Sequence, residues 1–418
     1  MSESKKLIPR RRFKEFEANN NWLNISLKDV TDSISYGLNV AAKNYDGFNK
    51  YLRITDIDDE SREFKKDSLT SPNIEIKLAN NYKLQIGDIL FARTGASVGK
   101  TYRYKESDGH VYYAGFLIRL RLKSICNSEF IYQNTLSKRY KKFIQITSQR
   151  SGQPGVNANE YSNFVFATPN LKEQTQIGEF FKKLDKLINT QQKKLEKAKT
   201  LKSAYLTEMF PNEGELKPRY RFLGFKKDWS ITQFKNLANI RRGLTYTPSN
   251  LALDGVRILR SSNIDSDRFI LRNDDIFIDQ SYVSISLVKE NDILITSANG
   301  SSRLVGKHAL IKITNNEKAV HGGFMLLATS NQPFFTNAIM SSNWYRKFLN
   351  TYVAGGNGAI GNLNKTELAN QDISIPTTLE QTQIGNFFKL LDNKIALEQK
   401  KLDKLKNIKQ AYLNEMFV

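Results

Sequence analysis

The stretch EQTQIGEFFKKLDKLINTQQKKLEKAKTLKSAYLTEMF (173–210) decides the fold, because EQTQIGNFFKLLDNKIALEQKKLDKLKNIKQAYLNEMF (380–417) repeats it. The two stretches are identical at 25 of 38 positions without a gap. Their offset of 207 residues is half of the chain, which is too long for a solenoid repeat. The repeat therefore indicates a duplicated half-molecule.

Both stretches have the composition of one long helix. Neither contains proline, and both are rich in Lys, Glu, Gln and Leu. Their apolar residues recur at steps of three, four or seven, the spacing of a stripe that packs on a partner helix. Because neither stripe can be buried alone, we expect each helix to pair with the other; two unrelated surface helices are the alternative. The predicted packing residues are Ile177, Phe180, Leu184, Leu187, Leu195, Leu201, Tyr205, Ile384, Phe387, Leu391, Ile395, Leu402, Leu405 and Tyr412.

The charge of the chain indicates a polyanionic partner. The net charge is +21 at pH 7, and 40% apolar residues are enough for folded cores. A folded chain this basic usually binds a polyanion, with nucleic acid as the first candidate. The two repeated stretches carry only a small part of the excess, so most of it lies in the other segments. A membrane-surface protein is the rival, but no run of eighteen apolar residues exists.

The remaining composition predicts a cytoplasmic protein without a membrane partner. The start MSESKKLIPRRR (1–12) lacks the apolar region of a signal peptide. The single cysteine, Cys126, cannot form an internal disulfide, which fits a reducing compartment. His110, His308 and His321 lack the spacing of metal ligands, so we expect neither a metal nor another cofactor.

The duplication extends, more faintly, to the segments between the helices. QIGDILFARTGASVGK (85–100) corresponds to KENDILITSANGSSRLVGK (289–307), and each reads as an apolar strand, a Gly/Ser loop and Gly-Lys. A Gly- and Asn-rich loop then precedes each long helix. The predicted fold class is therefore α+β, with a mixed α/β globule before each helix. The predicted segments are a first globule over 1–170, a helix over 171–212, a second globule over 213–377 and a helix over 378–418.

Two motifs that suggest catalysis have better structural interpretations. RTGASVGKT (93–101) resembles a phosphate loop, but Gly95 and Gly99 enclose three residues where such a loop needs four. A tight turn that could contact a phosphate backbone is the better interpretation. Asp67 with Glu75-Ile76-Lys77 resembles a nuclease pattern, but it has no counterpart in the second half, so we expect a solvated strand edge.

The loops carry the residue types that read nucleic acid. Arg reads guanine, Asn and Gln read adenine, and Lys contacts phosphates. For any single residue a turn is the alternative, but the basic excess favours DNA contact for the loops as a set. The candidates in the first half are Tyr36, Asn39, Arg53, Arg93, Lys100, Gln149, Arg150, Asn157 and Asn159. Those in the second half are Arg241, Arg242, Tyr246, Arg260, Arg303, Lys307, Asn357, Asn362 and Asn364.

The chain combines the globule–helix–globule–helix order with GDILFARTGASVGK, the GNGAIGNLNK loop and the EQxxIGxFFxxLD motif at the start of each helix. In these features the chain resembles the specificity subunit of type I restriction–modification enzymes. The likeness covers essentially the whole chain. It implies two target-recognition domains, each reading one half of a split double-stranded DNA site. It also implies two antiparallel coiled-coil helices with pseudo-two-fold symmetry, which set the spacing and dock two methyltransferase subunits. Motor–nuclease restriction subunits are the further partners that it implies, and the chain itself catalyses nothing.

Two other classes of function remain open. One is an enzyme acting on nucleic acid, such as a divergent nuclease, and the other is a coiled-coil organiser that does not read DNA. Cleavage by the pure chain would support the enzyme. Absence of DNA binding even with a methyltransferase partner would favour the organiser.

Overall fold

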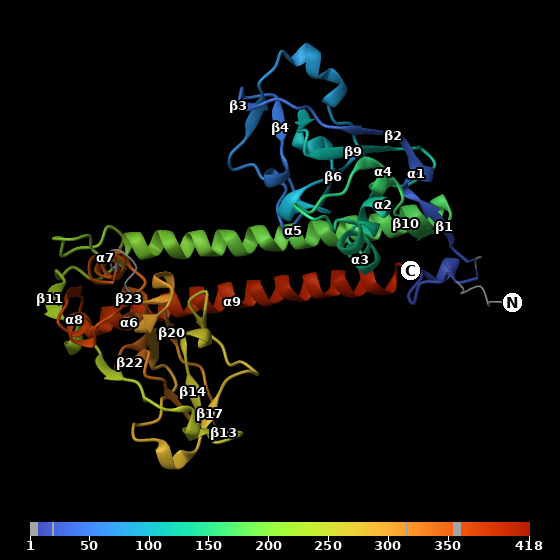
Figure 1. Ribbon diagram of the computed structural model, residues 1–418. Coiled ribbons are helices and arrows are strands. Elements are labelled where there is room, and N and C mark those ends of the chain that lie inside the picture. Colours follow the sequence, from blue (N-terminus) through green and yellow to red (C-terminus); the bar gives the residue numbers. More distant parts are fainter. Residues whose placement is uncertain (1–6, 19–20, 315–316, 354–360) are drawn as a thin grey trace. The chain divides into compact units, whose positions relative to one another are not determined.

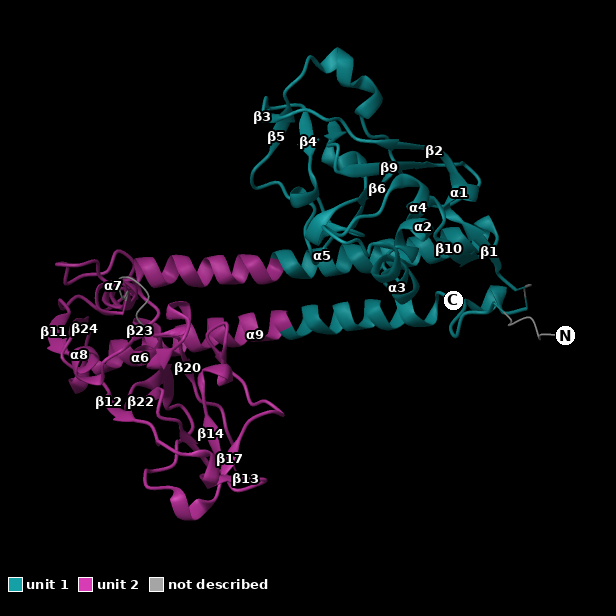
Figure 2. Cartoon of the chain, viewed as in Figure 1, with its two compact units in different colours: residues 1–193, 400–418 teal, residues 194–399 magenta. Residues whose placement is uncertain are grey.

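The two repeated stretches form helices of 38 residues each, as predicted (Figure 1). They are α5 (Leu171–Glu208) and α9 (Thr378–Glu415). The computed structural model describes residues 7–18, 21–314, 317–353 and 361–418. The chain divides into unit 1, Met1–Lys193 with Lys400–Val418, and unit 2, Lys194–Gln399 (Figure 2). Each unit contains a globular head and a part of both long helices, so the units cut across the predicted segments.

An antiparallel four-stranded sheet in the order β2-β9-β6-β7 forms the centre of the head of unit 1. Both of its faces are buried. Phe91 on β6 packs against helices, whereas its neighbour Leu90 packs with Leu52 on the opposite face. Successive side chains of a strand point to opposite faces, which explains the unbroken apolar run in DILFA. The strands are β2 (Thr31–Tyr36), β6 (Ile89–Ala92), β7 (Thr101–Arg103) and β9 (Leu117–Leu122).

The other elements of unit 1 lie around this sheet. A parallel pair, β4 (Lys50–Leu52) with β8 (Val111–Tyr113), supplies residues to the core on one face. Helices and the pair β1 (Leu23–Ser26) with β10 (Val165–Thr168) supply the core on the other. The remaining elements are α1 (Leu27–Val30), α2 (Ser128–Asn134), α3 (Lys138–Thr147), α4 (Ala158–Ser162), β3 (Ala42–Asn44) and β5 (Thr70–Pro72).

Unit 2 repeats this construction. Its antiparallel sheet has the order β12-β22-β18-β20, and its parallel pair is β14 with β21. The sheet strands are β12 (Asn239–Arg242), β18 (Ile293–Thr296), β20 (His308–Leu310) and β22 (Met325–Thr329). The other elements are β11 (Ser230–Gln233), β13 (Leu251–Ala252), β14 (Val256–Leu259), β15 (Ile264–Asp265), β16 (Arg268–Phe269), β17 (Phe277–Ile278), β19 (Ala298–Asn299), β21 (Ala319–His321), β23 (Gly361–Asn362), β24 (Asp372–Ile375), α6 (Pro333–Ile339), α7 (Asn343–Tyr352) and α8 (Lys365–Ala369).

The glutamate that opens each repeated stretch forms a buried ion pair with the basic segment before its own head. Glu173 accepts two hydrogen bonds from the guanidinium of Arg12, at 2.6 and 2.7 Å. Glu380 accepts two from Arg221 at the same distances. Both carboxylates are fully buried, and the hydrogen bond to Glu173 raises the pKa of Arg12. The pair therefore fixes the start of the chain of each head against its long helix.

The single glycine of each repeated stretch allows a close approach between helices. A Cβ at Gly178 would lie 2.5 Å from Asn127 Oδ1, just before α2. A Cβ at Gly385 would lie 2.7 Å from the backbone nitrogen of Phe335 in α6. The helical cost of glycine is thus offset by direct contact between the long helix and the head.

The FF and LD positions of the motif pair the two long helices inside each unit. In unit 1 the rings of Phe180 and Tyr412 lie 4.9 Å apart, and Asp185 binds Lys409 at 2.6 Å. In unit 2 Phe387 and Tyr205 lie 4.9 Å apart, and Asp392 binds Lys202 at 2.6 Å. In both cases the later residue on one helix meets the earlier residue on the other. The two helix segments are therefore antiparallel within each unit.

Each head is completed by the end of the helix that follows the other head. Leu413, Met416 and Phe417 lie in the core of unit 1. Leu206, Met209 and Phe210 lie in the core of unit 2. These are the two copies of YLxEMF, so their near-identity follows from filling equivalent cores.

Two of the residues predicted to pack between the helices are instead exposed. Leu187 is 56% exposed and Leu201 is 41% exposed. The three-and-four spacing of the stripe is compatible with Leu187 and Leu201, but the helix face that contacts the partner helix does not include them. Of the others, Ile177, Leu184, Leu195, Ile384 and Leu402 are buried, and Phe180, Tyr205, Phe387, Leu391, Ile395, Leu405 and Tyr412 are partly buried.

A buried histidine distinguishes the core of unit 2. His321 ends β21, where Tyr113 ends β8 in unit 1. Its Nε2 lies 3.3 Å from the carbonyl oxygen of Arg241, and its Nδ1 has no partner among the described residues. Burial lowers the pKa of His321 to about 4, and burial also lowers the pKa of His308 in the same unit.

Acid should therefore destabilise unit 2 before unit 1. An unfolded imidazole binds its proton near pH 6.5, whereas folded His321 resists protonation until about pH 4. The free energy of unfolding of unit 2 should fall across this window, by on the order of 1.4 kcal/mol per pH unit. Urea titrations at pH 7 and pH 5, with each unit followed by pulse proteolysis, measure this. His321→Gln should reduce the pH dependence and leave the part that is due to His308, and equal losses in both units would contradict the prediction.

Candidate nucleic-acid interface

Three segments of unit 1 meet at one edge of its central sheet. Tyr36 ends β2, Arg93 follows β6 and Phe116 precedes β9. Because β9 runs antiparallel to both neighbours, the ends of β2 and β6 lie beside its start (Figure 1). The topology therefore brings together three positions that are far apart in the sequence.

Backbone contacts hold this edge in place. The amide of Arg93 donates to the carbonyl of Phe116 at 3.0 Å, and the carbonyl of Arg93 accepts from Val156 at 2.9 Å. A Cβ at Gly37 would lie 2.1 Å from the carbonyl oxygen of Ala114, so only glycine fits after Tyr36. The Gly-rich loop before α4 is thereby tied to the strand ends.

The side chains at this edge form an aromatic–arginine cluster of Tyr36, Arg93 and Phe116. The guanidinium carbon of Arg93 lies 5.1 Å from the ring centre of Tyr36 and 5.9 Å from that of Phe116. The hydroxyl of Tyr36 accepts a hydrogen bond from the amide of Ala158 at 3.2 Å. Phe116 is 55% exposed. A planar cation and two aromatic rings are thus presented together at the surface, which suits contact with bases and phosphates.

Unit 2 has the same backbone arrangement with different side chains. Arg242 stands in the place of Tyr36, and Ser297 in that of Arg93. The amide of Ser297 donates to the carbonyl of Phe324 at 2.9 Å, and Phe324 is 75% exposed. A Cβ at Gly243 would lie 1.9 Å from the carbonyl oxygen of Gly322. Arg242 is exposed and has no ion-pair partner among the residues that the structure describes.

Several of the predicted contact residues also have partners within their own unit. Asn157 caps α4 by accepting from the amide of Glu160 at 2.9 Å, and Asn364 caps α8 by accepting from Thr366 at 2.8 Å. Arg150 forms an ion pair with Glu160. Arg53 binds Asp56, Arg260 reaches the carbonyl of Asp274, and Arg241 lies 3.6 Å from Asp292. Side chains engaged in this way have less capacity left for bases.

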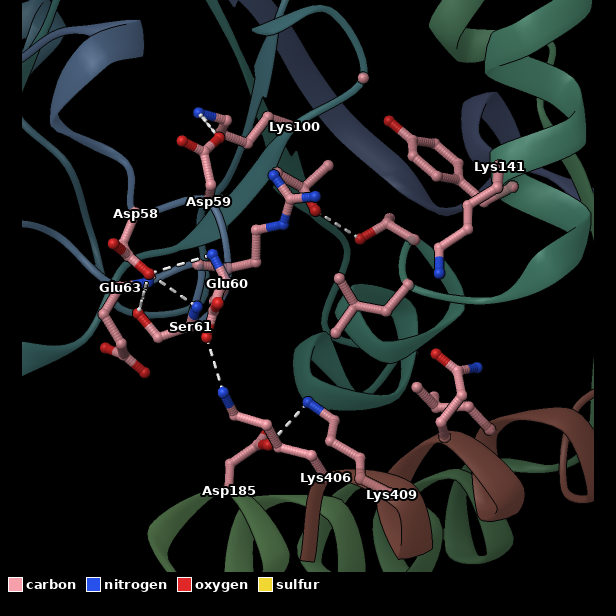
Figure 3. Close-up of a pocket in the computed structure, with 18 of the residues that line it drawn as sticks. Asp58, Asp59, Glu60, Ser61, Glu63, Lys100, Lys141, Asp185, Lys406 and Lys409 are labelled. Carbon is pink, nitrogen blue, oxygen red and sulfur yellow. Dashed lines mark hydrogen bonds and ion pairs between the residues drawn. The ribbon is translucent and has the colours of Figure 1, made fainter. Parts of the chain in front are cut away.

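Lys100, predicted to contact phosphate, points into the protein. Its ammonium nitrogen lies 2.5 Å from Asp59 and 3.2 Å from the carbonyl oxygen of Ile57, and the residue is only 7% exposed. Figure 3 shows it at a pocket of about 1030 Å³ within unit 1, which Asp185 and Lys409 also line. The prediction for Lys100 is corrected, because a buried and paired ammonium group cannot reach DNA without breaking this contact.

The other predicted residues vary in exposure. Tyr246 and Lys307 are partly buried, and Asn357 lies outside the described residues. Asn39, Gln149, Asn159, Arg303 and Asn362 are exposed. The prediction from sequence omitted Phe116 and Phe324, although the matched dipeptides Gly115-Phe116 and Gly323-Phe324 mark them in both halves.

Other kinds of site receive no support from the described part of the chain. There, no group of His, Cys, Asp and Glu residues is arranged as a metal site. Nor does any described helix have the length and apolar character needed to cross a membrane.

Comparison with known proteins gives matches that run through both halves. The family model "Type I restriction modification DNA specificity domain" matches residues 19–200 and again residues 226–407. The MjaVIII specificity subunit of a type I restriction enzyme from Methanocaldococcus jannaschii is 21% identical over 85% of this chain and 83% of its own length. The putative MjaX specificity subunit of the same organism is 23% identical over 94% of this chain and 92% of its own.

A solved structure shares the fold. The crystal structure of the S subunit of a type I restriction–modification system from M. genitalium aligns with a TM-score of 0.67 at 13% identity, over 98% of this chain and 99% of that one. The two domain matches cover most of the residues and coincide with the duplicated construction of the two units. The chain therefore belongs to the type I restriction–modification DNA specificity family and is a specificity subunit with two recognition domains.

Proposed function

We propose that each unit reads one half of a split sequence in double-stranded DNA. The observation that carries this is the pair of equivalent sheet edges, where one backbone arrangement holds Tyr36 and Arg93 in unit 1 but Arg242 and Ser297 in unit 2. A shared frame with different side chains is what two readers of different sequences require. Arginine at either edge can donate to guanine, and the exposed amides nearby can pair with adenine.

The long helices serve the partners of the complex in this proposal. They set the spacing between half-sites and dock two methyltransferase subunits, and motor–nuclease restriction subunits complete the complex in the cytoplasm. Leu187, Leu201, Leu390 and Leu397 support the docking, because each leaves an apolar side chain exposed on a long helix. The chemical steps then belong to the partners, and this chain supplies recognition.

Exchanging one head should change one half-site. We expect that replacing residues 217–375 with the second head of another family member leaves both repeated stretches, and hence the core of unit 1, unchanged. Methylation-site mapping in cells that carry the exchanged chain and its methyltransferase partner should show one new and one original half-site. If both half-sites change together, reading by separate units is wrong.

Salt dependence should separate surface cations from buried ones. Arg303→Gln removes an exposed cation and should reduce the slope of log K against log salt by about 0.9, if Arg303 touches a phosphate. Lys100→Gln should leave this slope unchanged, because Lys100 is paired with Asp59 inside unit 1. Fluorescence anisotropy with the methyltransferase-bound chain, at salt concentrations from about 50 to about 200 mM, measures the slope for each variant. A reduced slope for Lys100→Gln would return Lys100 to the interface.

A further inference from the structure

Among the described residues, Phe116 and Phe324 are large apolar side chains that the two units expose at the same place. Each lies third in a four-residue turn, in which Leu117 donates to Ala114 and Met325 donates to Gly322, both at 2.8 Å. Each also accepts a backbone hydrogen bond from the segment beyond β6 or β18. The backbone of each phenylalanine is therefore held on two sides while its ring is left in solvent.

The surroundings of the two rings are polar. Arg93 lies over the ring of Phe116, and Asn39 lies beside Gly115, the residue before Phe116 in the turn. In unit 2 the hydroxyl of Thr245 lies close to Gly323, and Arg242 is exposed at the end of the adjacent strand. A docking site for another protein usually surrounds its aromatic anchor with apolar groups. An exposed ring beside guanidinium, amide and hydroxyl groups, with the ring of Tyr36 over the same arginine in unit 1, instead matches the faces and edges of nucleic-acid bases.

We propose that Phe116 and Phe324 each insert against the base stack of the half-site that their own unit reads. This inference rests on the proposed reading of DNA by the two units and adds the contact through which each unit deforms its half-site. An inserted ring partly unstacks a base step, and arginine beside it holds the flanking phosphates or base edges. The cost of unstacking depends on the step, so the ring contributes selectivity at a position without a hydrogen bond to a base.

The test uses the full chain bound to its methyltransferase partner. The DNA duplexes carry the fluorescent base 2-aminopurine at one position at a time along each half-site, except at the base that is methylated. Binding should raise the fluorescence at one step in each half-site. Phe116→Ala should abolish the rise in the first half-site only, and Phe324→Ala in the second only. Each variant should bind between about 5- and 150-fold more weakly, and tyrosine in the same place should restore both signals.

Leu78→Ala in unit 1 and Leu253→Ala in unit 2 are matched controls, because both remove an exposed apolar side chain that belongs to neither four-residue turn. They should change neither affinity nor fluorescence. Thermal unfolding of all four alanine variants should match the parent, since none of the removed side chains is buried.

Three outcomes would overturn the insertion. The parent complex could bind its site specifically without a fluorescence rise in either half-site. The phenylalanine variants could bind and unstack DNA as the parent does. They could also lose the methyltransferase subunit, which would assign the rings to a protein partner. Failure of the parent complex to bind any specific sequence would instead refute the proposed function.

Discussion

Phe417→Ala is expected to lower the free energy of unfolding of unit 1 by about 3–5 kcal/mol, although residue 417 lies more than 200 positions beyond the head it supports. Its ring is 8% exposed and packs on Phe130 of α2 at 5.3 Å and on Phe181 of α5 at 5.6 Å. Truncation leaves a cavity between the head and the two helices that the surrounding core cannot fill. Urea titration with pulse proteolysis reads the stability of each unit separately.

The matched variant is Phe210→Ala. Phe210 fills the equivalent place in unit 2, 6.0 Å from Trp229 and 5.9 Å from Phe388. It should destabilise unit 2 by a similar amount while unit 1 keeps its stability. Equal losses in both units from either variant, or a loss in the opposite unit, would show that the helix ends do not belong to the cores assigned to them.

Glu173→Gln should have a comparable effect by a different mechanism. The substitution preserves shape but removes the negative charge of Glu173 from beside the buried guanidinium of Arg12, and breaking a buried pair from one side costs about 3–5 kcal/mol. The free energy of unfolding of unit 1, measured in the same way, should fall accordingly. Glu380→Gln should act on unit 2 through Arg221.

Two controls separate charge from shape. Glu415→Gln interrupts the exposed pair with Arg11 and should have a much smaller effect, because solvent screens that pair. The double variant Arg12→Met with Glu173→Leu should recover most of the lost stability, since apolar residues of similar volume can replace a buried pair. No recovery would mean that the pair also provides a geometry that apolar side chains cannot supply.

The bounds of the long helices could be predicted almost to the residue, because the same sequence pattern occurs twice in the chain. Each motif letter then has a local cause: Glu173 pairs with Arg12, Gly178 admits the head and Phe180 meets Tyr412. Which leucines face the partner could not be predicted, because a stripe at three-and-four spacing is wider than the contact. The exposure of Leu187 follows from that ambiguity.

The candidate site was less accessible to sequence reasoning. Residue type predicts Tyr36 and Arg93 as candidates, but their contact depends on strand order, which short strands do not reveal. Lys100 and Asn157 are of residue types that contact DNA, but Lys100 forms an ion pair with Asp59 and Asn157 caps the start of α4. Phe116 was missed because a lone apolar residue reads as core until its exposure is seen.

The placement of each helix end in the other half's head also sets an order of assembly. The head of unit 1 is synthesised first, yet its core needs Leu413, Met416 and Phe417, which follow the whole of unit 2 along the chain. Unit 1 therefore has to wait for the ribosome to finish unit 2 before its core can close. In a nascent or prematurely terminated chain, the core of unit 1 is therefore incomplete. Both readers become competent together, which suits a protein whose proposed task requires both half-sites at once.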